Sequence, residues 1–197
     1  AVNANGDSAA SSGVSVTPLI GGAYYSIQTV TQSNSNSSTI SFDVSSLTSY
    51  KHLQIRGVLK DGRGDGNKGN AFYVRFNNDA SNIYRCTYSI NPDGGSSTGS
   101  TAYSSAAYFN DTAFNCYAVA TASSPANDMG PVIMDIYDFR DTNKMKTFRC
   151  LGGINNNNAG NQAVSYSGGS WGSTAAIDSI QIIASSGNWQ QYSSLAL

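Results

Sequence analysis

The stretch from Pro131 to Gly153, PVIMDIYDFRDTNKMKTFRCLGG, carries the clearest structural signal in the chain. Its first half alternates between two sets of side chains, Val132, Met134 and Ile136 on one side and Ile133, Asp135 and Tyr137 on the other. A side-chain period of two is typical of a strand with one buried face. After the polar corner at 141–144 the alternation resumes. The stretch therefore predicts an antiparallel hairpin.

Short alternating runs separated by polar turns continue along the whole chain. Further strands are expected at 22–30, 39–44, 50–60, 71–77, 82–90, 102–110, 113–121, 162–167 and 177–184, and from Trp189 onward. The first two runs are expected to pair as neighbours, and 102–110 is expected to form a hairpin with 113–121. This spacing predicts an all-β fold, an antiparallel, jelly-roll-like β-sandwich of roughly nine or ten strands.

Composition favours the same fold class. The 197 residues include 20 glycines, and all 12 acidic side chains are aspartates. Because aspartate favours turns and glutamate favours helix interiors, this choice argues against substantial helix. The length suits one domain, so residues 22–197 are expected to form a single β-sandwich domain. Residues 1–21, which show no hydrophobic period, are expected to be a flexible or partner-docked arm.

Charge and apolar runs argue against several classes of partner. The formal net charge is −1 and charged residues make up 12% of the chain, so there is no basic patch of the kind that nucleic acid requires. No apolar run approaches the ~20 residues of a membrane span, and residues 1–17 lack the basic start and apolar centre of a signal peptide. We therefore expect neither a nucleic-acid partner nor membrane insertion.

The three cysteines, Cys86, Cys116 and Cys150, form an odd set without CxxC spacing. Each lies within a strand-like run, so buried thiols that act as small apolar side chains are the preferred interpretation. A disulfide or a metal site is the alternative. No metal and no cofactor are expected, because the sequence also lacks nucleotide, phosphate and zinc motifs.

No catalytic residue is assigned. The one histidine, His52, is expected on the outward side of the strand at 50–60, where a catalytic triad would need partners on an exposed face. Most aspartates fall in turns, and nothing marks a pair held at the separation that glycoside hydrolysis requires.

Two aspartates inside the strong hairpin, Asp135 and Asp138, are exceptions, because aspartate is disfavoured in strands. They are expected to be satisfied by nearby cations. The candidates are Arg140, Lys146 and Arg149.

The glycine-rich loop DGRGDGNKGN at 61–70 carries two superficial motifs. Asp61, Asp65 and Asn67 space oxygen ligands as in a calcium loop, but Arg63 occupies the middle ligand position and no glutamate closes the site. The tripeptide that begins at Arg63 also matches an adhesion motif. Chance occurrence is the preferred interpretation of both motifs, and Arg63, Asp65 and Asn67 are candidates for a contact loop.

Tyrosine is abundant, with 12 residues, and it suits contact surfaces because it offers a large area at low entropy cost. Five tyrosines are candidates for a sugar-binding or protein-binding surface: Tyr73, Tyr84, Tyr88, Tyr103 and Tyr108. The alternative is that they cap the faces of the sheets. Trp171 and Trp189 are expected to plug the ends of the fold.

Several phrases of the sequence look familiar together: TSYKHLQIRG at 48–57, YVRFNND at 73–79, MDIYDFRDTNKMKTFRCLGG at 134–153, WGSTAAIDSIQI at 171–182 and WQQYSSLAL at 189–197. The chain resembles a β-rich module of uncharacterised virion structural proteins of tailed bacteriophages, notably marine and cyanophage-like ones. The resemblance spans most of residues 22–197, and its phrases are structural rather than catalytic. It implies a tail-fibre-like or head-decoration protein located in the virion.

The resemblance and the lack of catalytic motifs predict a non-enzymatic structural protein of a phage virion. It would be a surface-displayed capsid decoration or fibre component that acts by protein–protein packing, with other virion proteins and copies of itself as partners. A trimer is expected by analogy with other virion surface modules. The alternative is a tail-fibre module that recognises a host-surface glycan. A polysaccharide-degrading enzyme is a third class.

Overall fold

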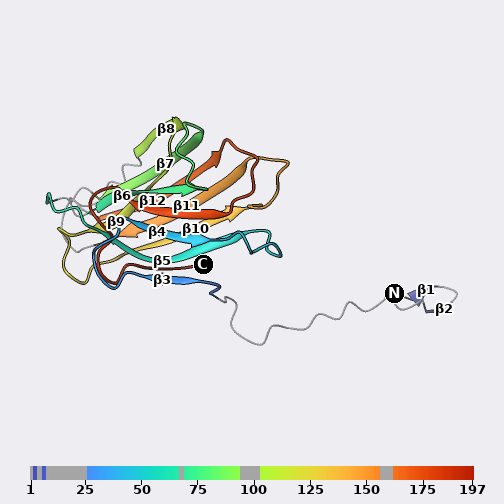
Figure 1. Ribbon diagram of the computed structural model, residues 1–197, viewed down its shortest axis with the longest axis horizontal. Helices are drawn as coiled ribbons and strands as arrows, with labels where there is room; N and C mark the ends of the chain where they lie inside the picture. Colours follow the sequence, from blue (N-terminus) through green and yellow to red (C-terminus); the bar gives the residue numbers. More distant parts are fainter. Residues whose placement is uncertain (1, 4–5, 8–25, 67–68, 94–102, 156–161) are drawn as a thin grey trace.

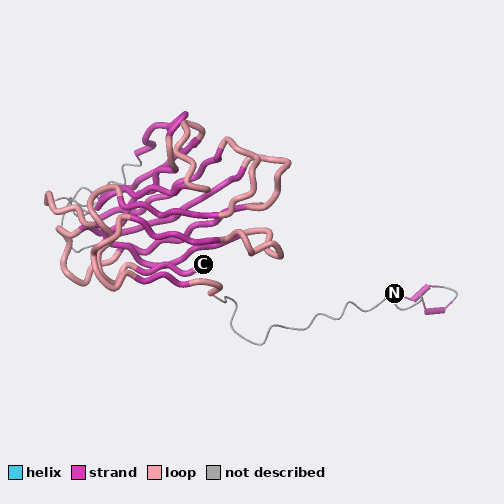
Figure 2. Tube along the Cα trace, in the orientation of Figure 1, coloured by secondary structure: helices cyan, strands magenta, loops and turns pink. Residues whose placement is uncertain are grey.

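The computed structural model describes residues 2–3, 6–7, 26–66, 69–93, 103–155 and 162–197. Within these ranges the chain is all-β, as expected, and contains no helix (Figure 2). The arm expected at 1–21 lies largely outside the described residues. Its described parts, β1 (Val2–Asn3) and β2 (Gly6–Asp7), pair with each other and form a sheet separate from the main one.

Twelve strands form one continuous sheet, which is more than the nine or ten expected. They are β3 (Thr29–Thr31), β4 (Thr39–Asp43), β5 (Leu53–Asp61), β6 (Gly69–Phe76), β7 (Tyr84–Asp93), β8 (Tyr103–Asp111), β9 (Phe114–Thr121), β10 (Gly130–Tyr137), β11 (Lys146–Ile154), β12 (Gln162–Trp171), β13 (Ser179–Ala184) and β14 (Ser194–Ala196). Their order is β4-β13-β6-β9-β5-β10-β11-β12-β7-β8, with β14 bonded to β5 and β3 bonded to β14 (Figure 1). Among the described strands, the pairing of β5 with β9 is parallel and the others are antiparallel.

The sheet folds over at this parallel joint, so that β9 packs against β11, β12 and β7. Aromatic side chains fill the space between them. Phe114 of β9 stacks on Phe148 of β11 with ring centroids 4.6 Å apart, and the Tyr84 ring lies edge-on to Phe114 at 5.0 Å. Phe76 and Trp171 extend this buried cluster. Burial of these large rings stabilises the folded-over arrangement.

The hairpin predicted between Pro131 and Gly153 is present as β10 and β11, which pair in antiparallel register. Val132, Met134 and Ile136 are buried, and more exposed side chains alternate with them, as a period of two requires. The other edge of β10 pairs with β5. The strongest pattern in the sequence therefore lies in the interior of the sheet and not at its edge.

Two expected pairings are wrong. The strand expected at 22–30 is limited to β3 within the described residues, and β3 pairs with β14 while β4 pairs with β13. Likewise β8 pairs with β7, whereas β9 pairs with β6 and β5, so the two do not form the expected hairpin. Burial explains this difference, because Phe114 and Cys116 of β9 are fully buried in the interior, while β8 lies at the end of the strand order.

Cys86, Cys116 and Cys150 are all free and buried, as expected of thiols that act as small apolar side chains. Burial raises the pKa of the Cys86 thiol to about 11 and the pKa of Cys116 well above its ordinary value. Both thiols therefore stay protonated at neutral pH. The described residues contain no group of three or more His, Cys, Asp or Glu side chains that could hold a metal ion.

Two lysines, Lys60 and Lys146, are buried. Each ammonium group donates hydrogen bonds to three backbone oxygens in nearby loops. The acceptors of Lys60 are Ser124, Pro125 and Ala126, and those of Lys146 are Asp141, Lys144 and Thr174. Burial lowers the pKa of both lysines. The two side chains thus satisfy carbonyl groups that the strand ladders leave unpaired.

Lys146→Met is expected to lower the free energy of unfolding by about 2–3 kcal/mol. Buried carbonyl groups that lose their donor cost about 1–3 kcal/mol each, and removal of the buried charge offsets part of this loss. Urea denaturation followed by tryptophan fluorescence measures the change. Lys51→Met, at a side chain that is 77% exposed, is the matched control and should change stability by less than about 0.5 kcal/mol. Equal effects of the two substitutions would show that the three contacts of Lys146 contribute nothing.

Candidate functional site

The five candidate tyrosines lie on strands rather than in loops, and the structure does not gather them on one surface. Tyr84 is fully buried, and its hydroxyl bonds to the backbone of Phe76 and Asp79. Burial raises the pKa of Tyr84 to about 12. Tyr84 is therefore a core residue and cannot contact a partner. The alternation along β7 places Tyr84 and Tyr88 on the same face of the strand.

The remaining tyrosines lie on β6 and on the paired strands β7 and β8. Tyr73 is half-buried on the outward side of β6, where it lines a shallow hollow with Arg75. Tyr88 lies on β7 opposite Ser167, whose side chain is buried. Tyr103 and Tyr108 belong to β8, and their side chains lie outside the described part of the chain.

In the loop after β5, two charged side chains of the loop pair with each other. The Arg63 guanidinium donates through Nε to both carboxylate oxygens of Asp65, each at 2.9 Å, and this pairing raises the pKa of Arg63. The carboxylate of Asp61 accepts from the backbone of Arg63 and from Asn70. Asn67 lies outside the described residues. The two candidates that are described, Arg63 and Asp65, thus bind each other.

His52 lies just before β5 and holds the corner that follows β10. Its Nδ1 accepts a hydrogen bond of 3.0 Å from the backbone N–H of Asp138, and its ring lies edge-on to Tyr137. The Asp138 carboxylate pairs with Lys144 at 2.5 Å and with Lys51 at 3.7 Å. The hydrogen bond from Lys144 lowers the pKa of Asp138. The cations expected to pair with Asp138 are therefore not its partners in the structure.

A grouping of polar and exposed apolar side chains lies on the outer face of β5, β10, β11 and β12. Directly paired residues lie side by side across a sheet, so two rows of side chains cross this face. The first row consists of Gln54, Asp135, Arg149 and Gly168. The second row consists of Arg56, Ile133, Leu151 and Tyr166. Polar groups thereby lie beside apolar ones.

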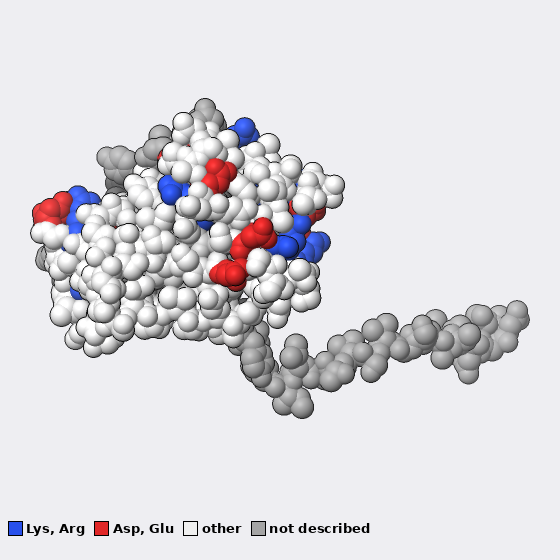
Figure 3. Space-filling model, in the orientation of Figure 1, with Lys and Arg blue, Asp and Glu red and all other residues white. Residues whose placement is uncertain are grey.

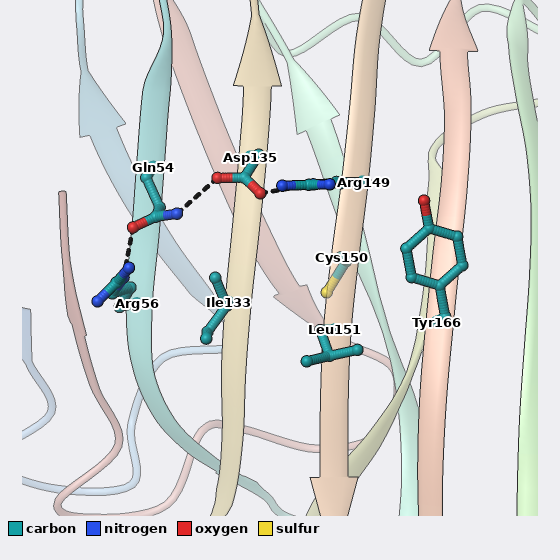
Figure 4. Close-up of a pocket in the computed structure, with 8 residues that line it drawn as sticks. All are labelled: Gln54, Arg56, Ile133, Asp135, Arg149, Cys150, Leu151 and Tyr166. Atoms are coloured by element: carbon teal, nitrogen blue, oxygen red, sulfur yellow. Dashed lines mark hydrogen bonds and ion pairs between the residues drawn. The ribbon is translucent and has the colours of Figure 1, made fainter.

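Asp135 is at the centre of the polar row (Figure 4). Its Oδ1 accepts from Gln54 Nε2 at 2.6 Å, and its Oδ2 accepts from Arg149 Nε at 2.7 Å. Arg56 donates from Nε to the amide oxygen of Gln54. The bond to Asp135 raises the pKa of the Arg149 guanidinium above its ordinary value. The expected pairing of Asp135 with Arg149 is confirmed. Together with the other two hydrogen bonds it orients four side chains, Arg56, Gln54, Asp135 and Arg149.

The apolar part of the face is unusually open for large side chains. Ile133, Leu151 and Tyr166 are 37%, 48% and 51% exposed. Together with polar side chains beside them they line a depression of about 340 Å³. We call it the outer-face hollow, defined by Gln54, Arg56, Ile133, Asp135, Arg149, Cys150, Leu151 and Tyr166. Its volume is near the lower end of the range of about 300–1,000 Å³ for small-ligand sites.

Sequence reasoning missed this hollow. Its residues come from four strands, and only the tertiary pairing decides that these strands are neighbours. One signal was present in the pattern, because Ile133, Leu151 and Tyr166 are large apolar residues at outward positions. Exposed apolar groups that cluster on one face mark contact surfaces.

Comparisons with known proteins found no matching family, no matching curated protein and no matching solved structure. No helix long and apolar enough to cross a membrane occurs in the described ranges. Function must therefore be inferred from the chemistry of the surface, because a fold class by itself is compatible with many functions.

Proposed function

We propose that this chain is a non-enzymatic surface protein of a tailed-phage virion, and that its jelly-roll-like β-sandwich recognises a glycan on the host surface. The phage assignment rests on the resemblance of phrases such as TSYKHLQIRG at 48–57. The folded-over sheet with aromatic rings between its layers supports the sandwich architecture. The outer-face hollow is the observation that favours recognition over packing as the leading role.

The hollow offers the two kinds of contact that a sugar needs. A sugar ring carries hydroxyl groups around its edge and C–H groups on its faces. Gln54 and Arg149 present polar groups for the edge, and bonds to Asp135 hold them in place before a ligand arrives. Leu151 and Tyr166 present exposed apolar surface for a face of the ring. Preorganised polar groups reduce the entropy cost of binding.

Structural packing, as a capsid decoration or fibre component, is the second candidate. Val164 of β12 is 61% exposed and extends the apolar surface beyond Leu151 and Tyr166. Most of the face in Figure 3 is uncharged, which reduces repulsion between neighbouring proteins. The partners in this role would be other virion proteins or copies of the chain, with a trimer as the assembly favoured by analogy.

Tyr166→Ala is expected to weaken glycan binding by about tenfold or more, because truncation of a central aromatic contact in a binding site costs at least ~1.4 kcal/mol. A glycan array with the purified protein identifies the ligand, and calorimetric titration measures both affinities. Tyr50→Ala is the matched control, since Tyr50 is 47% exposed and lies outside the hollow. The control variant should bind like the wild type.

Other outcomes decide between the candidate roles. One such outcome is that no glycan on the array is bound and that the chain self-associates in a salt-resistant way. If Val164→Asp abolishes this association in sedimentation, packing would replace recognition as the proposed role. Release of reducing ends from a polysaccharide would contradict the non-enzymatic assignment. Antibody labelling of intact virions tests the phage assignment itself, because a protein of the virion surface must be labelled.

A further inference from the structure

The lining of the outer-face hollow has a formal charge of +1. Its lining includes the two arginines Arg56 and Arg149 and a single carboxylate, Asp135. Arginine stays charged at any pH the protein meets, so this excess persists. The chain as a whole has a formal net charge of −1. A local positive charge on a slightly acidic protein points to a ligand that carries negative charge.

Arg149 is oriented before any ligand binds. Its Nε is held by Asp135, and its guanidinium carbon lies 5.6 Å from the centroid of the Tyr137 ring. Within the described residues its hydrogen bonds involve Nε, which leaves both terminal amino groups open on a side chain that is 52% exposed. A fixed guanidinium fork matches the two oxygens of a carboxylate.

A glycine lies beside Arg149. Gly168 of β12 is directly opposite Arg149 and has no side chain of its own at this position. A Cβ atom there would lie 3.8 Å from Cε1 and from the hydroxyl oxygen of Tyr166. In Figure 4 the hydroxyl of Tyr166 points along the sheet toward the level of Arg149. The ring of Tyr166 therefore lies against Gly168, across from Arg149, and Leu151 is the direct neighbour of Tyr166 on β11.

We propose that the outer-face hollow binds a sugar unit that bears a carboxylate, such as a uronic acid within an acidic polysaccharide. The carboxylate pairs with the terminal amino groups of Arg149, and the C–H face of the ring lies on Leu151 and Tyr166. This inference rests on the proposed glycan-recognition function. It adds that the ligand is negatively charged and that Arg149 recognises this charge.

The test compares an oligogalacturonate with the neutral galactose oligomer of the same length by calorimetric titration at low salt. We expect the wild type to prefer the acidic oligomer by about tenfold or more, because a hydrogen bond between charged groups is stronger than one between neutral groups. Added sodium chloride should reduce this preference. Arg149→Gln should abolish it, and Arg149→Lys should lose most of it, because lysine keeps the charge but lacks the fork.

Arg85→Gln is the matched control. Arg85 is exposed on β7, pairs with Ser170 of β12 and does not line the hollow, so the substitution removes the same charge from elsewhere on the sheet. Its acidic preference should stay within about twofold of the wild type. Equal losses in Arg85→Gln and Arg149→Gln would overturn the proposal in favour of diffuse charge attraction. Equal binding of both oligomers would overturn the acidic-sugar proposal and leave glycan recognition intact. Absence of all sugar binding would contradict both the acidic-sugar proposal and the proposed glycan recognition. Circular dichroism confirms that each variant is folded.

Discussion

Replacement of Phe114 by alanine is expected to lower the free energy of unfolding by about 3–5 kcal/mol, a large part of the total stability of about 5–15 kcal/mol that is typical of a domain. Phe114 is fully buried where β9 crosses β11. Its ring stacks on Phe148 at 4.6 Å and contacts Tyr84 and Phe76 edge-on at 5.0 Å and 5.3 Å. Alanine would leave a cavity among three other rings, none of which can move without losing its own contacts.

Urea denaturation of the purified variant, followed by tryptophan fluorescence, measures this loss. Phe114→Leu should cost less than half as much, because leucine keeps most of the apolar volume. Tyr50→Ala removes an aromatic ring that is 47% exposed and should change stability by less than about 1 kcal/mol. If Phe114→Ala were no more destabilising than Tyr50→Ala, the contact of β9 with β11 could not be what holds the folded-over sheet together.

The second large effect is expected at adjacent glycines of β12. A Cβ atom on Gly169 would lie 2.0 Å from the backbone oxygen of Arg85, whereas one on Gly168 would come no closer than 3.8 Å to any neighbour. Gly169→Ala therefore has to push β7 away from β12, since the obstructing atom belongs to the backbone. Overpacking of this kind costs about 1–3 kcal/mol or more, and we expect about 3 kcal/mol here.

Gly168→Ala is the matched control for this prediction, one residue away on the same strand. It adds a methyl group at ordinary contact distance, and alanine loses less backbone entropy on folding than glycine does. Its stability should lie within about 0.5 kcal/mol of the wild type or slightly above it. Hydrogen exchange of the β7 and β12 amides gives an independent readout, because only Gly169→Ala should speed exchange there. The register of β12 would have to be reconsidered if both variants were equally stable.

The local patterns in the sequence were sufficient to predict strand positions. Phe72, Val74 and Phe76 are buried along β6, and the side chains between them are half-buried, as the alternation predicts. The hairpin of β10 and β11 and the buried free cysteines were predicted as well. These features depend on side-chain period and turn residues, and both are local properties of the chain.

The sequence did not reveal which strands are neighbours. The turn at Asp111 looks like a hairpin turn, yet it carries the chain from the edge strand β8 into the interior strand β9. Such a turn is compatible with a hairpin of two neighbouring strands and with a connection between strands that do not pair. The outcome depends on how much apolar surface each arrangement buries. Tyr84 shows the same limit, because its environment is decided by Phe114 and Trp171, which belong to strands far from β7 in the sequence.

The sequence by itself determined that this protein is built from strands and where most of them lie. It also predicted a basic partner for Asp135, with Arg149 as one of three candidates. Only the tertiary structure decided that β5, β10, β11 and β12 lie side by side, and so brought Gln54 and Tyr166 onto the same face. The physical reason is that a strand's alternation fixes which side chains face outward but not which strand lies next to it. That choice is made by burial of the whole core, and the outer-face hollow is a consequence of it.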